Sequence, residues 1–334
     1  MLTRETLLAE ASQLGVQPDM LEKVVRLASL LGHLRDHPYL GGRWALKGGT
    51  ALNLFCLEVP RLSVDIDLNY IGAPDRATMQ AERPNVERAV EQACRREGLT
   101  LQRIPSDHAG GKWRLRYESL LSGGGNLELD LNFLQRVPLW PVELRDARLG
   151  SLVETTSIPV LDLHELVAGK LVALLARRAA RDLFDAHRLL VDEQLDAERL
   201  RLAFAVYAGA SRVDCRTMAA ERVDYEPGEL KDSLLPVLRQ TTRETFQADP
   251  DWPRHLVSEC RPRLAAVLPF TDAESAFLDR LLEQGEIEPE LLTTDAELAE
   301  RIRLQPGLRW KALNVRQYRQ RGTAPSSNDS AGQG

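Results

Sequence analysis

The chain lacks the features of several protein classes. Its four cysteines, Cys56, Cys94, Cys215 and Cys260, are scattered without CxxC spacing, which argues against a zinc site or a disulfide framework. No stretch approaches the roughly 20 apolar residues that span a membrane, and the first residues carry acids and no long apolar core, unlike a signal peptide. Aromatic residues make up only 5% and the net charge is −6, so the chain as a whole is not a polycation. We therefore expect a cytoplasmic protein without a membrane segment.

Apolar periodicity predicts a different architecture in each half of the 334 residues. Helices are expected at 3–35, 50–57 and 76–98, where Pro84 can interrupt the last one. Short strands are expected at 45–46, 62–71 and 99–104. Two more, at 113–117 and 127–134, flank a glycine-rich turn and predict a β-hairpin. From about residue 160 the pattern is helical, at 162–190, 196–208, 228–246, 254–266, 272–283 and 295–303.

These elements predict an α/β (α+β) protein with two lobes. We expect a domain with a mixed sheet and helices over residues 1–155 and a mostly α-helical domain over 156–322. The tail, 323–334, is small and polar and is predicted to be disordered.

Two short motifs lie close together in the first half. A small-residue turn, Gly48-Gly49-Thr50, precedes room for one helix, and Asp65 and Asp67 follow in an apolar run. Residues two apart on a strand leave the same face, so the two carboxylates are expected side by side. Glycines let the backbone approach a ligand, and a helix starting at Thr50 would favour an anion at its N-terminus. Phosphate beside carboxylates that can share magnesium predicts nucleotidyl transfer, although a structural turn and solvated acids are the alternative.

A third acid, Asp130, stands in the apolar strand after the glycine-rich turn. We predict that it is a third metal ligand beside Asp65 and Asp67, where it can help to activate an attacking hydroxyl. Glu128 faces the same way by period two, and a solvent-facing strand acid is the other interpretation. The residue pattern leaves this assignment open.

The proline-free segment 162–190 carries a row of charged residues. On one continuous helix, the row falls within a stripe about 80° wide; its members are Lys170, Arg177, Arg181, Asp185 and Arg188. Such a row predicts a grip on a triphosphate, with Lys170 neutralising the leaving pyrophosphate. Asp185 would orient Lys170, order an arginine or contact the nucleotide. Arg178 and Asp182 lie off the stripe and are interpreted as surface or structural residues, and a solvated face with i,i+4 pairs is the alternative for the whole row.

Taken together, these segments resemble a known family. KGGTALNL, RLSVDIDL, and ELVAGKL followed by ARRAARDLFDAHRL are similar, in this order, to the motifs of the AbiEii/AbiGii nucleotidyltransferase toxins. The MenT toxins are relatives, and the family belongs to the DNA polymerase β-like nucleotidyltransferase superfamily. The resemblance covers about residues 40–190, and PGLRWKALN at 306–314 is similar to the end of many members. It implies a nucleotidyltransferase-like fold for the N-terminal domain.

The resemblance also implies a set of site residues and partners. Carried over by position, Ser63, Asp65 and Asp67 come from the motif strand, and Lys170 and Asp185 from the helix. The family implies an NTP co-substrate, Mg²⁺ or Mn²⁺, a nearby antitoxin, and growth arrest or phage defence. Some members modify tRNA ends, so tRNA or another RNA is the leading acceptor. We predict catalytic roles for Asp65, Asp67, Lys170 and Asp185, and nucleotide binding by Gly48, Gly49, Thr50, Ser63, Lys170, Arg177 and Arg181.

The most basic segment is 301–321, with seven Arg or Lys, no acid, and Trp310 and Tyr318 interleaved. Basic side chains contact phosphates and aromatic rings stack on bases, so this segment is a candidate RNA-binding patch. A basic helix end packed on the acidic body, or an antitoxin-binding surface, would have the same composition.

Two other functions stay open at this stage. The same site can adenylylate a protein or a small molecule, and a degenerate copy of the fold can serve as a non-catalytic binding module. Intact Asp65, Asp67 and Lys170 argue against the second function. The sequence does not identify the NTP, the acceptor or the antitoxin.

Overall fold

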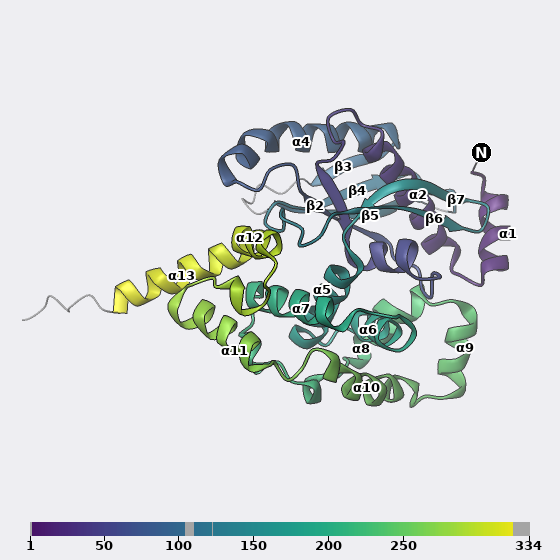
Figure 1. The fold of residues 1–334 in the computed structure, drawn as a ribbon. Coiled ribbons are helices and arrows are strands. Elements are labelled where there is room, and N and C mark those ends of the chain that lie inside the picture. The colour runs from purple at the N-terminus through teal and green to yellow at the C-terminus, as the bar shows by residue number, and fades with distance from the viewer. Residues whose placement is uncertain (1, 104–109, 122, 323–334) are drawn as a thin grey trace, which may run out of the picture.

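The computed structural model describes residues 2–103, 110–121 and 123–322, so the predicted disordered tail lies outside the described residues. Its first half holds a seven-stranded mixed sheet and its second half is almost wholly helical, which confirms the predicted fold class. Figure 1 shows the sheet and its covering helices in one layer and the helical half beneath it. In the described ranges, no helix has the length and apolarity to cross a bilayer.

The first half contains every strand of this sheet. Its helical elements are α1 (Arg4–Leu14), α2 (Pro18–Arg35), α3 (Gly48–Thr50), the π-helical segment η1 (Ala51–Cys56) and α4 (Arg76–Arg96). Its strands are β1 (Trp44–Lys47), β2 (Asp65–Tyr70), β3 (Thr100–Arg103), β4 (Gly110–Tyr117), β5 (Gly125–Asn132), β6 (Glu143–Leu149) and β7 (Val153–Val160).

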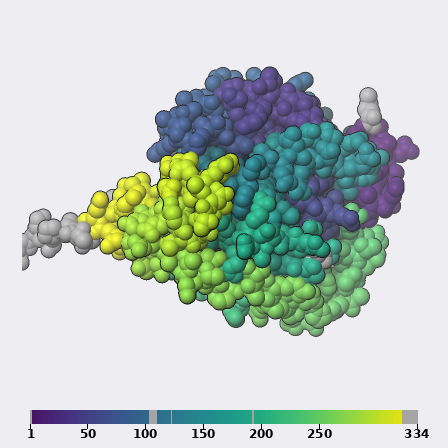
Figure 2. All heavy atoms as spheres, viewed as in Figure 1, coloured from purple at the N-terminus to yellow at the C-terminus, as the bar shows by residue number. Residues whose placement is uncertain are grey.

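The second half is built from helices joined by short helical turns. Its helices are α5 (Leu163–Ala176), α6 (Ala180–Asp192), α7 (Ala197–Ala210), α8 (Pro227–Glu229), α9 (Gln240–Ala248), α10 (Trp252–Arg263), α11 (Asp272–Asp279), α12 (Ala296–Leu304) and α13 (Pro306–Gly322). The turns are η2 (Cys215–Thr217), η3 (Ala220–Arg222), η4 (Leu230–Leu234), η5 (Leu235–Val237), η6 (Leu264–Ala266), η7 (Arg280–Gln284) and η8 (Pro289–Leu291). Figure 2 shows the C-terminal residues, in yellow, on the front of the molecule, with only their last stretch reaching out at the left.

The sheet runs in the order β3-β4-β5-β2-β1-β7-β6, so β2 lies at its centre. β2 pairs antiparallel with β1 and parallel with β5, and β4 and β5 form the predicted hairpin. Along β2 the apolar residues Ile66 and Leu68 are buried, whereas Asp65 and Asp67 leave the opposite face. β6 and β7 have no counterpart in the sequence-based expectation.

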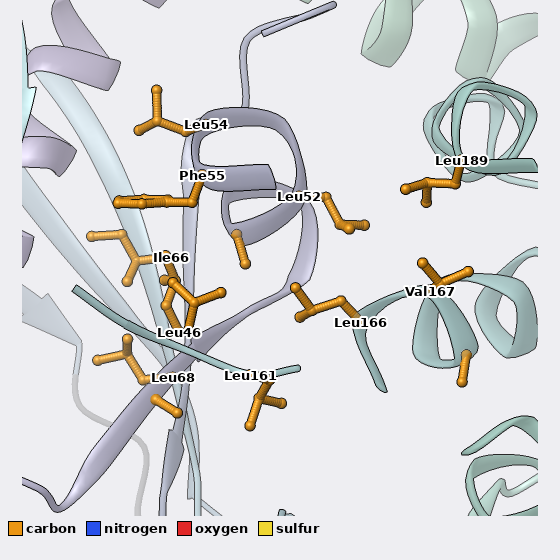
Figure 3. Packing of buried hydrophobic residues seen from close by; sticks show 14 of the residues in the cluster. Leu46, Leu52, Leu54, Phe55, Ile66, Leu68, Leu161, Leu166, Val167 and Leu189 are labelled. Atoms are coloured by element: carbon orange, nitrogen blue, oxygen red, sulfur yellow. The ribbon is translucent and has the colours of Figure 1, made fainter. Parts of the chain in front are cut away.

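A single buried apolar cluster continues from the sheet into the helices. Figure 3 shows Leu52 of η1 near Leu166 of α5, and Val167 of α5 facing Leu189 of α6. Because a fully buried leucine contributes about 1.5–3 kcal/mol, these contacts hold α5 and α6 against the segment that follows β1. The cluster thereby fixes both walls of the cleft described below.

One local expectation was wrong, and the structure decides one point that the sequence left open. The segment 162–190 is two helices, because α5 ends at Ala176 and Arg177 has extended backbone angles, φ −143° and ψ 145°. The helix α4 continues through Pro84 without interruption. The four cysteines all lie in described segments and are free thiols.

Candidate active site

A cleft of about 500 Å³ lies between the central strand and the helical half, a volume in the usual range of small-ligand sites. Eight of the predicted site residues line it, namely Gly48, Gly49, Ser63, Asp65, Asp67, Lys170, Arg177 and Arg181. Three other predicted residues, Thr50, Asp130 and Asp185, are not among its lining residues. The tertiary structure therefore joins motifs that are more than 100 residues apart in the chain.

The glycine turn is packed tightly against the motif strand. Gly48 has φ +74°, and a Cβ built there would lie 2.0 Å from Asp67 Oδ2. A Cβ on Gly49 would lie 2.9 Å from Ser63 Oγ and 3.1 Å from Arg61 Nη2. The two glycines thus make room for side chains of the protein itself, and this close approach places Asp67 directly beside the start of α3.

Thr50 supports the motif strand from behind. Its side chain is fully buried, its hydroxyl donates to the Asp65 carbonyl oxygen, and it lies 3.1 Å from Ser63 Oγ. A hydroxyl held in this way is turned into the protein, so these contacts give the Thr50 side chain a structural role, and nucleotide binding by Thr50 stays a prediction. Thr50 instead fixes the backbone that carries Asp65.

The carboxylate of Asp67 has a charged environment that sequence reasoning missed. It faces Lys47 of β1 on one side and Asp130 of β5 on the other. Burial raises the pKa of Asp67 above its ordinary value, Lys47 opposes this rise, and Asp130 and Asp65 add to it. The Lys47 ammonium donates to Gln135 Oε1 at 2.7 Å. The position of Lys47 directly before the two glycines was the available signal for its inclusion.

Glu128 and Asp130, which the sequence could not separate, have different partners. Glu128 faces Asp65 in the register and accepts from Lys112 Nζ at 2.8 Å. Asp130 faces Asp67. Of the two acids, Asp130 is therefore the one whose charge helps to raise the pKa of the buried Asp67 carboxylate.

Lys170 is held by two carboxylates from the next helix. Its Nζ lies 2.8 Å from Asp182 Oδ1 and 3.0 Å from Asp185 Oδ2. Burial lowers the pKa of Lys170, but the two carboxylates outweigh burial and the net direction is upward. On one continuous helix, residues 12 apart would be separated by about 18 Å along the axis. The break after α5 is what brings Asp182 back to Lys170, so of the two interpretations, surface or structural, the structural one applies to this buried residue.

Asp185 is the centre of a buried ion-pair network. Arg61 contacts it with two parallel hydrogen bonds, Nε to Oδ1 at 2.7 Å and Nη2 to Oδ2 at 2.6 Å. Asn53 donates to it at 3.2 Å and to the Gly49 carbonyl at 3.0 Å. Burial raises the pKa of Asp185. Arg61 and Lys170 together lower this pKa by more than burial raises it, so the net shift is downward. Asp185 is fully buried. Of the three roles that the sequence allowed, these contacts agree with orienting Lys170 and ordering an arginine, and contact with the nucleotide stays a prediction.

Two arginines complete the cleft on the side of α6. Arg181 Nη1 lies 3.5 Å from Asp65 Oδ2, and both side chains are partly exposed. Arg177 donates from Nε to Asp182 Oδ2 at 2.7 Å and is largely exposed. Arg188, which the continuous-helix expectation placed in the same row, lines a different hollow near Trp252. Three cations of the predicted row on 162–190 thus line the cleft, namely Lys170, Arg177 and Arg181. The other cations that line it, Lys47, Arg61 and Arg178, were not part of that row.

A buried acid of α5, Glu165, was also missed. It lines the cleft and accepts from the backbone N–H groups of Leu139 and Trp140 at 3.0 and 3.3 Å and from the Tyr207 hydroxyl at 3.0 Å. Burial raises the pKa of Glu165 to about 7, although these hydrogen bonds oppose the rise. The residue ties α5 to α7 and to the segment before β6.

The acids on β2 fit a divalent cation in chemical type. Two neighbouring carboxylates, one of them with a raised pKa, are the oxygen donors that Mg²⁺ prefers, and a cation would relieve their repulsion. In the described part of the chain, no three His, Cys, Asp or Glu side chains are grouped as a metal site. Asp130 is therefore opposite Asp67 in the strand register, but its carboxylate does not form a three-membered cluster with those of Asp65 and Asp67.

With this geometry in view, the chain can be compared with known proteins. The profile of the family described as "Nucleotidyl transferase AbiEii toxin, Type IV TA system" matches residues 29–304, most of the chain. The chain belongs to the AbiEii nucleotidyltransferase toxin family. This confirms the resemblance based on its motifs. The family description places AbiEii proteins in toxin–antitoxin systems, which implies an antitoxin partner.

Solved structures add a likeness in fold. The AbiEii chain is similar to MenT4, a nucleotidyltransferase toxin from Mycobacterium tuberculosis H37Rv, with a TM-score of 0.62 and 20% sequence identity. The match covers 91% of this chain and 99% of the MenT4 chain. A search of curated proteins finds no match.

Proposed function

We propose that this AbiEii protein transfers a nucleoside monophosphate from an NTP to an acceptor hydroxyl, with the 3′ end of a tRNA as the leading acceptor. The observation that carries the proposal is the cleft itself. Asp65 and Asp67 stand on one wall, and Lys170, Arg177 and Arg181 on the other. Carboxylates for a metal opposite cations for phosphates are what this reaction requires. Family membership supports the same reaction class.

Asp65 and Asp67 are the residues that would hold Mg²⁺ or Mn²⁺, and Asp130 is the third candidate ligand. The bound metal would supply charge stabilisation for the triphosphate and the attacking oxygen. Lys47 moderates the repulsion among these acids, because its ammonium group opposes the rise in the Asp67 pKa.

The cations opposite the acids would bind the triphosphate. Arg181 is the nearest of them to Asp65, and Arg177 is exposed at the cleft mouth. Lys170 is oriented by Asp182 and Asp185, so its ammonium is fixed before the substrate arrives. Gly48 and Gly49 expose backbone at the start of α3, and Ser63 lies beside them as a further hydrogen-bonding group. Thr50 and Asp185 act as positioning residues.

In the reaction, the acceptor oxygen forms a bond to the α-phosphorus while the bond to the β-phosphate oxygen breaks. Pyrophosphate leaves toward the cations of α5 and α6. The proton of the acceptor hydroxyl passes to one of the carboxylates of Asp65, Asp67 and Asp130. As the charge of the leaving pyrophosphate grows, Lys170 and Arg181 stabilise it. We further propose that this modification arrests growth, as in abortive phage defence, and that an antitoxin encoded nearby relieves it.

The test is transfer of label from each α-³²P NTP to total bacterial RNA in the presence of Mg²⁺. Wild type is compared with Asp67→Ala and with Asp251→Ala, a control at an exposed position just before α10 that does not line the cleft. We expect label in the tRNA band with wild type and the control, and at least about a hundredfold less with Asp67→Ala, because the metal loses a ligand.

Other outcomes separate the competing functions. RNase-resistant label on a protein band would assign the site to protein adenylylation. Transfer by Asp67→Ala at the wild-type rate would show that the acids are wrongly assigned. Absence of nucleotide binding and of any transfer would leave a binding module.

A further inference from the structure

β4 carries a row of cations on its exposed face. Its residues alternate along the strand, with Trp113, Leu115 and Tyr117 buried and Lys112, Arg114 and Arg116 exposed. In a strand this alternation puts all three cations on one face of the sheet, and all three apolar residues on the other. The local sequence KWRLRY thus builds a one-sided basic surface.

The register places this basic face beside the acids of β2. Lys112 is opposite Asp130, which is opposite Asp67; Arg114 is opposite Glu128, which is opposite Asp65. Directly opposite residues share a face of a sheet. With two strand spacings between them, the cations lie about 10 Å from the acids across the sheet. We call Lys112, Arg114 and Arg116 the β4 track.

The β4 track keeps a positive excess. Lys112 and Arg114 share the single carboxylate of Glu128, at 2.8 and 3.8 Å, and both are 62% exposed. Among the residues that the structure describes, Arg116 has no carboxylate partner. On this face of β4 and β5, three cations meet two acids, Glu128 and Asp130. One positive charge remains in excess on a chain whose net charge is −6, and this is the sign that a phosphodiester chain requires.

The position of the β4 track is complementary to the cleft. Lys170, Arg177 and Arg181 reach the acids from α5, α6 and the segment between them, whereas the β4 track lies in the sheet itself, beyond β5. A nucleotide and an acceptor strand would then approach Asp65 and Asp67 along separate surfaces. In-line displacement at phosphorus requires that the attacking and leaving oxygens do not share one binding surface.

The basic segment 301–321 is less suited to this position. Arg301 and Arg303 are paired with acids of α12 and η8, and Arg309 and Arg319 donate to backbone carbonyls. Figure 1 shows α13 running away from the sheet. Binding of RNA by that segment stays a prediction, and it is a separate arm of the test below.

We propose that the β4 track binds the phosphate backbone of the acceptor RNA and leads its 3′ end to Asp65 and Asp67. This rests on the proposed function for the identity of the acceptor. Alternate residues of a strand are about 6.7 Å apart, a spacing that suits successive phosphates of an extended single strand. Binding through such contacts is sequence-tolerant and depends strongly on salt.

The test measures RNA binding directly. A fluorescein-labelled tRNA and a labelled 12-nucleotide single strand are titrated by anisotropy at several KCl concentrations. The variant Lys112→Gln/Arg114→Gln/Arg116→Gln is compared with Arg95→Gln/Arg148→Gln/Arg254→Gln, which removes the same charge from three highly exposed positions elsewhere. Binding of an NTP to each variant is measured in parallel.

The logarithm of the RNA association constant is expected to decrease with log[KCl] for wild type. In the β4 variant the slope should be less steep by about 2, because three phosphate contacts at about 0.7 each are lost. Its RNA affinity should fall on the order of tenfold or more at 0.1 M KCl, while NTP binding and the control variant are unchanged. An unaltered slope in the β4 variant, or an absence of RNA binding by wild type, would overturn the proposal. So would loss of RNA binding in the α13 variant Lys311→Gln/Arg316→Gln while the β4 variant still binds like wild type.

The same experiment separates this inference from the proposed function. Asp67→Ala should bind RNA like wild type, since it lies outside the β4 track, and should fail to transfer label. Transfer by Asp67→Ala together with loss of RNA binding in the β4 variant would reject the catalytic assignment and keep the track.

Discussion

Replacing Gly48 by alanine tests the central contact of the site. Gly48 has φ +74°, and its added Cβ would lie 2.0 Å from Asp67 Oδ2. Real Cβ contacts essentially never fall below 3.0 Å, so the carboxylate must move by at least about 1 Å. A misplacement of this size at a reacting centre reduces the rate about a hundredfold, which equals about 2.7 kcal/mol of transition-state stabilisation.

Backbone strain alone must be subtracted from this effect. A left-handed alanine costs about 1–2 kcal/mol, and Gly98→Ala supplies the control, because Gly98 has φ +75° and no atom within 4 Å of its added Cβ. Both variants should lose about that much free energy of unfolding in urea. Any additional loss in Gly48→Ala measures the overlap with Asp67.

The assay is single-turnover transfer of ³²P label to RNA at saturating NTP, together with urea unfolding. We expect Gly98→Ala to stay within about threefold of wild type and Gly48→Ala to fall about a hundredfold. In an Asp67→Ala background, Gly48→Ala should lose its additional destabilisation, because the overlapping oxygen is absent. Equal activity of Gly48→Ala and Gly98→Ala would refute the reasoning that this contact sets the position of a catalytic Asp67.

Two further predictions concern buried charges. Asp185→Asn should lower the free energy of unfolding by about 3–5 kcal/mol, because it leaves the buried Arg61 without its carboxylate and takes one of two carboxylates from Lys170. The exposed pair of Arg35 and Asp36 is the control, and Asp36→Asn should cost less than about 1 kcal/mol. A urea titration that gives the same small loss for both would contradict the network. Glu165 has a pKa raised from 4.5 to about 7, so its contribution to stability is fully present below pH 4.5 and is lost as pH rises through about 7. At 1.36 kcal/mol per pH unit, Glu165→Gln should therefore gain about 3 kcal/mol relative to wild type between pH 4.5 and 8. A difference between the two proteins that does not change with pH would reject this burial effect.

Much of the site was predictable because its motifs are local. The alternation of Asp65 and Asp67 with buried apolar residues fixes their shared face, and the glycines before them indicate a turn. The hairpin of β4 and β5 followed from two strands around a glycine-rich turn. Such features depend on residues a few positions apart, so sequence periodicity is sufficient to detect them.

The charged row on 162–190 shows where local reasoning failed. The segment ARRAARDL has no proline or glycine and favours a continuous helix, yet the chain breaks between Ala176 and Ala180. The break brings Asp182 and Asp185 to Lys170 and packs α6 against α5 and α10. Buried ion pairs and apolar packing outweigh the helix propensity of two or three residues.

The sequence by itself determined the family and the fold class, and it predicted the strand acids and the lysine that line the cleft. Only the tertiary structure decided the partners of those residues. Arg61 with Asp185 and the β4 track beside the acids join elements that are distant in the chain or in the sheet, and Lys47 with Asp67 joins two neighbouring strands through their register. Their selection depends on which side chains share a buried or low-dielectric space, and that space exists only after the sheet and the helices have packed.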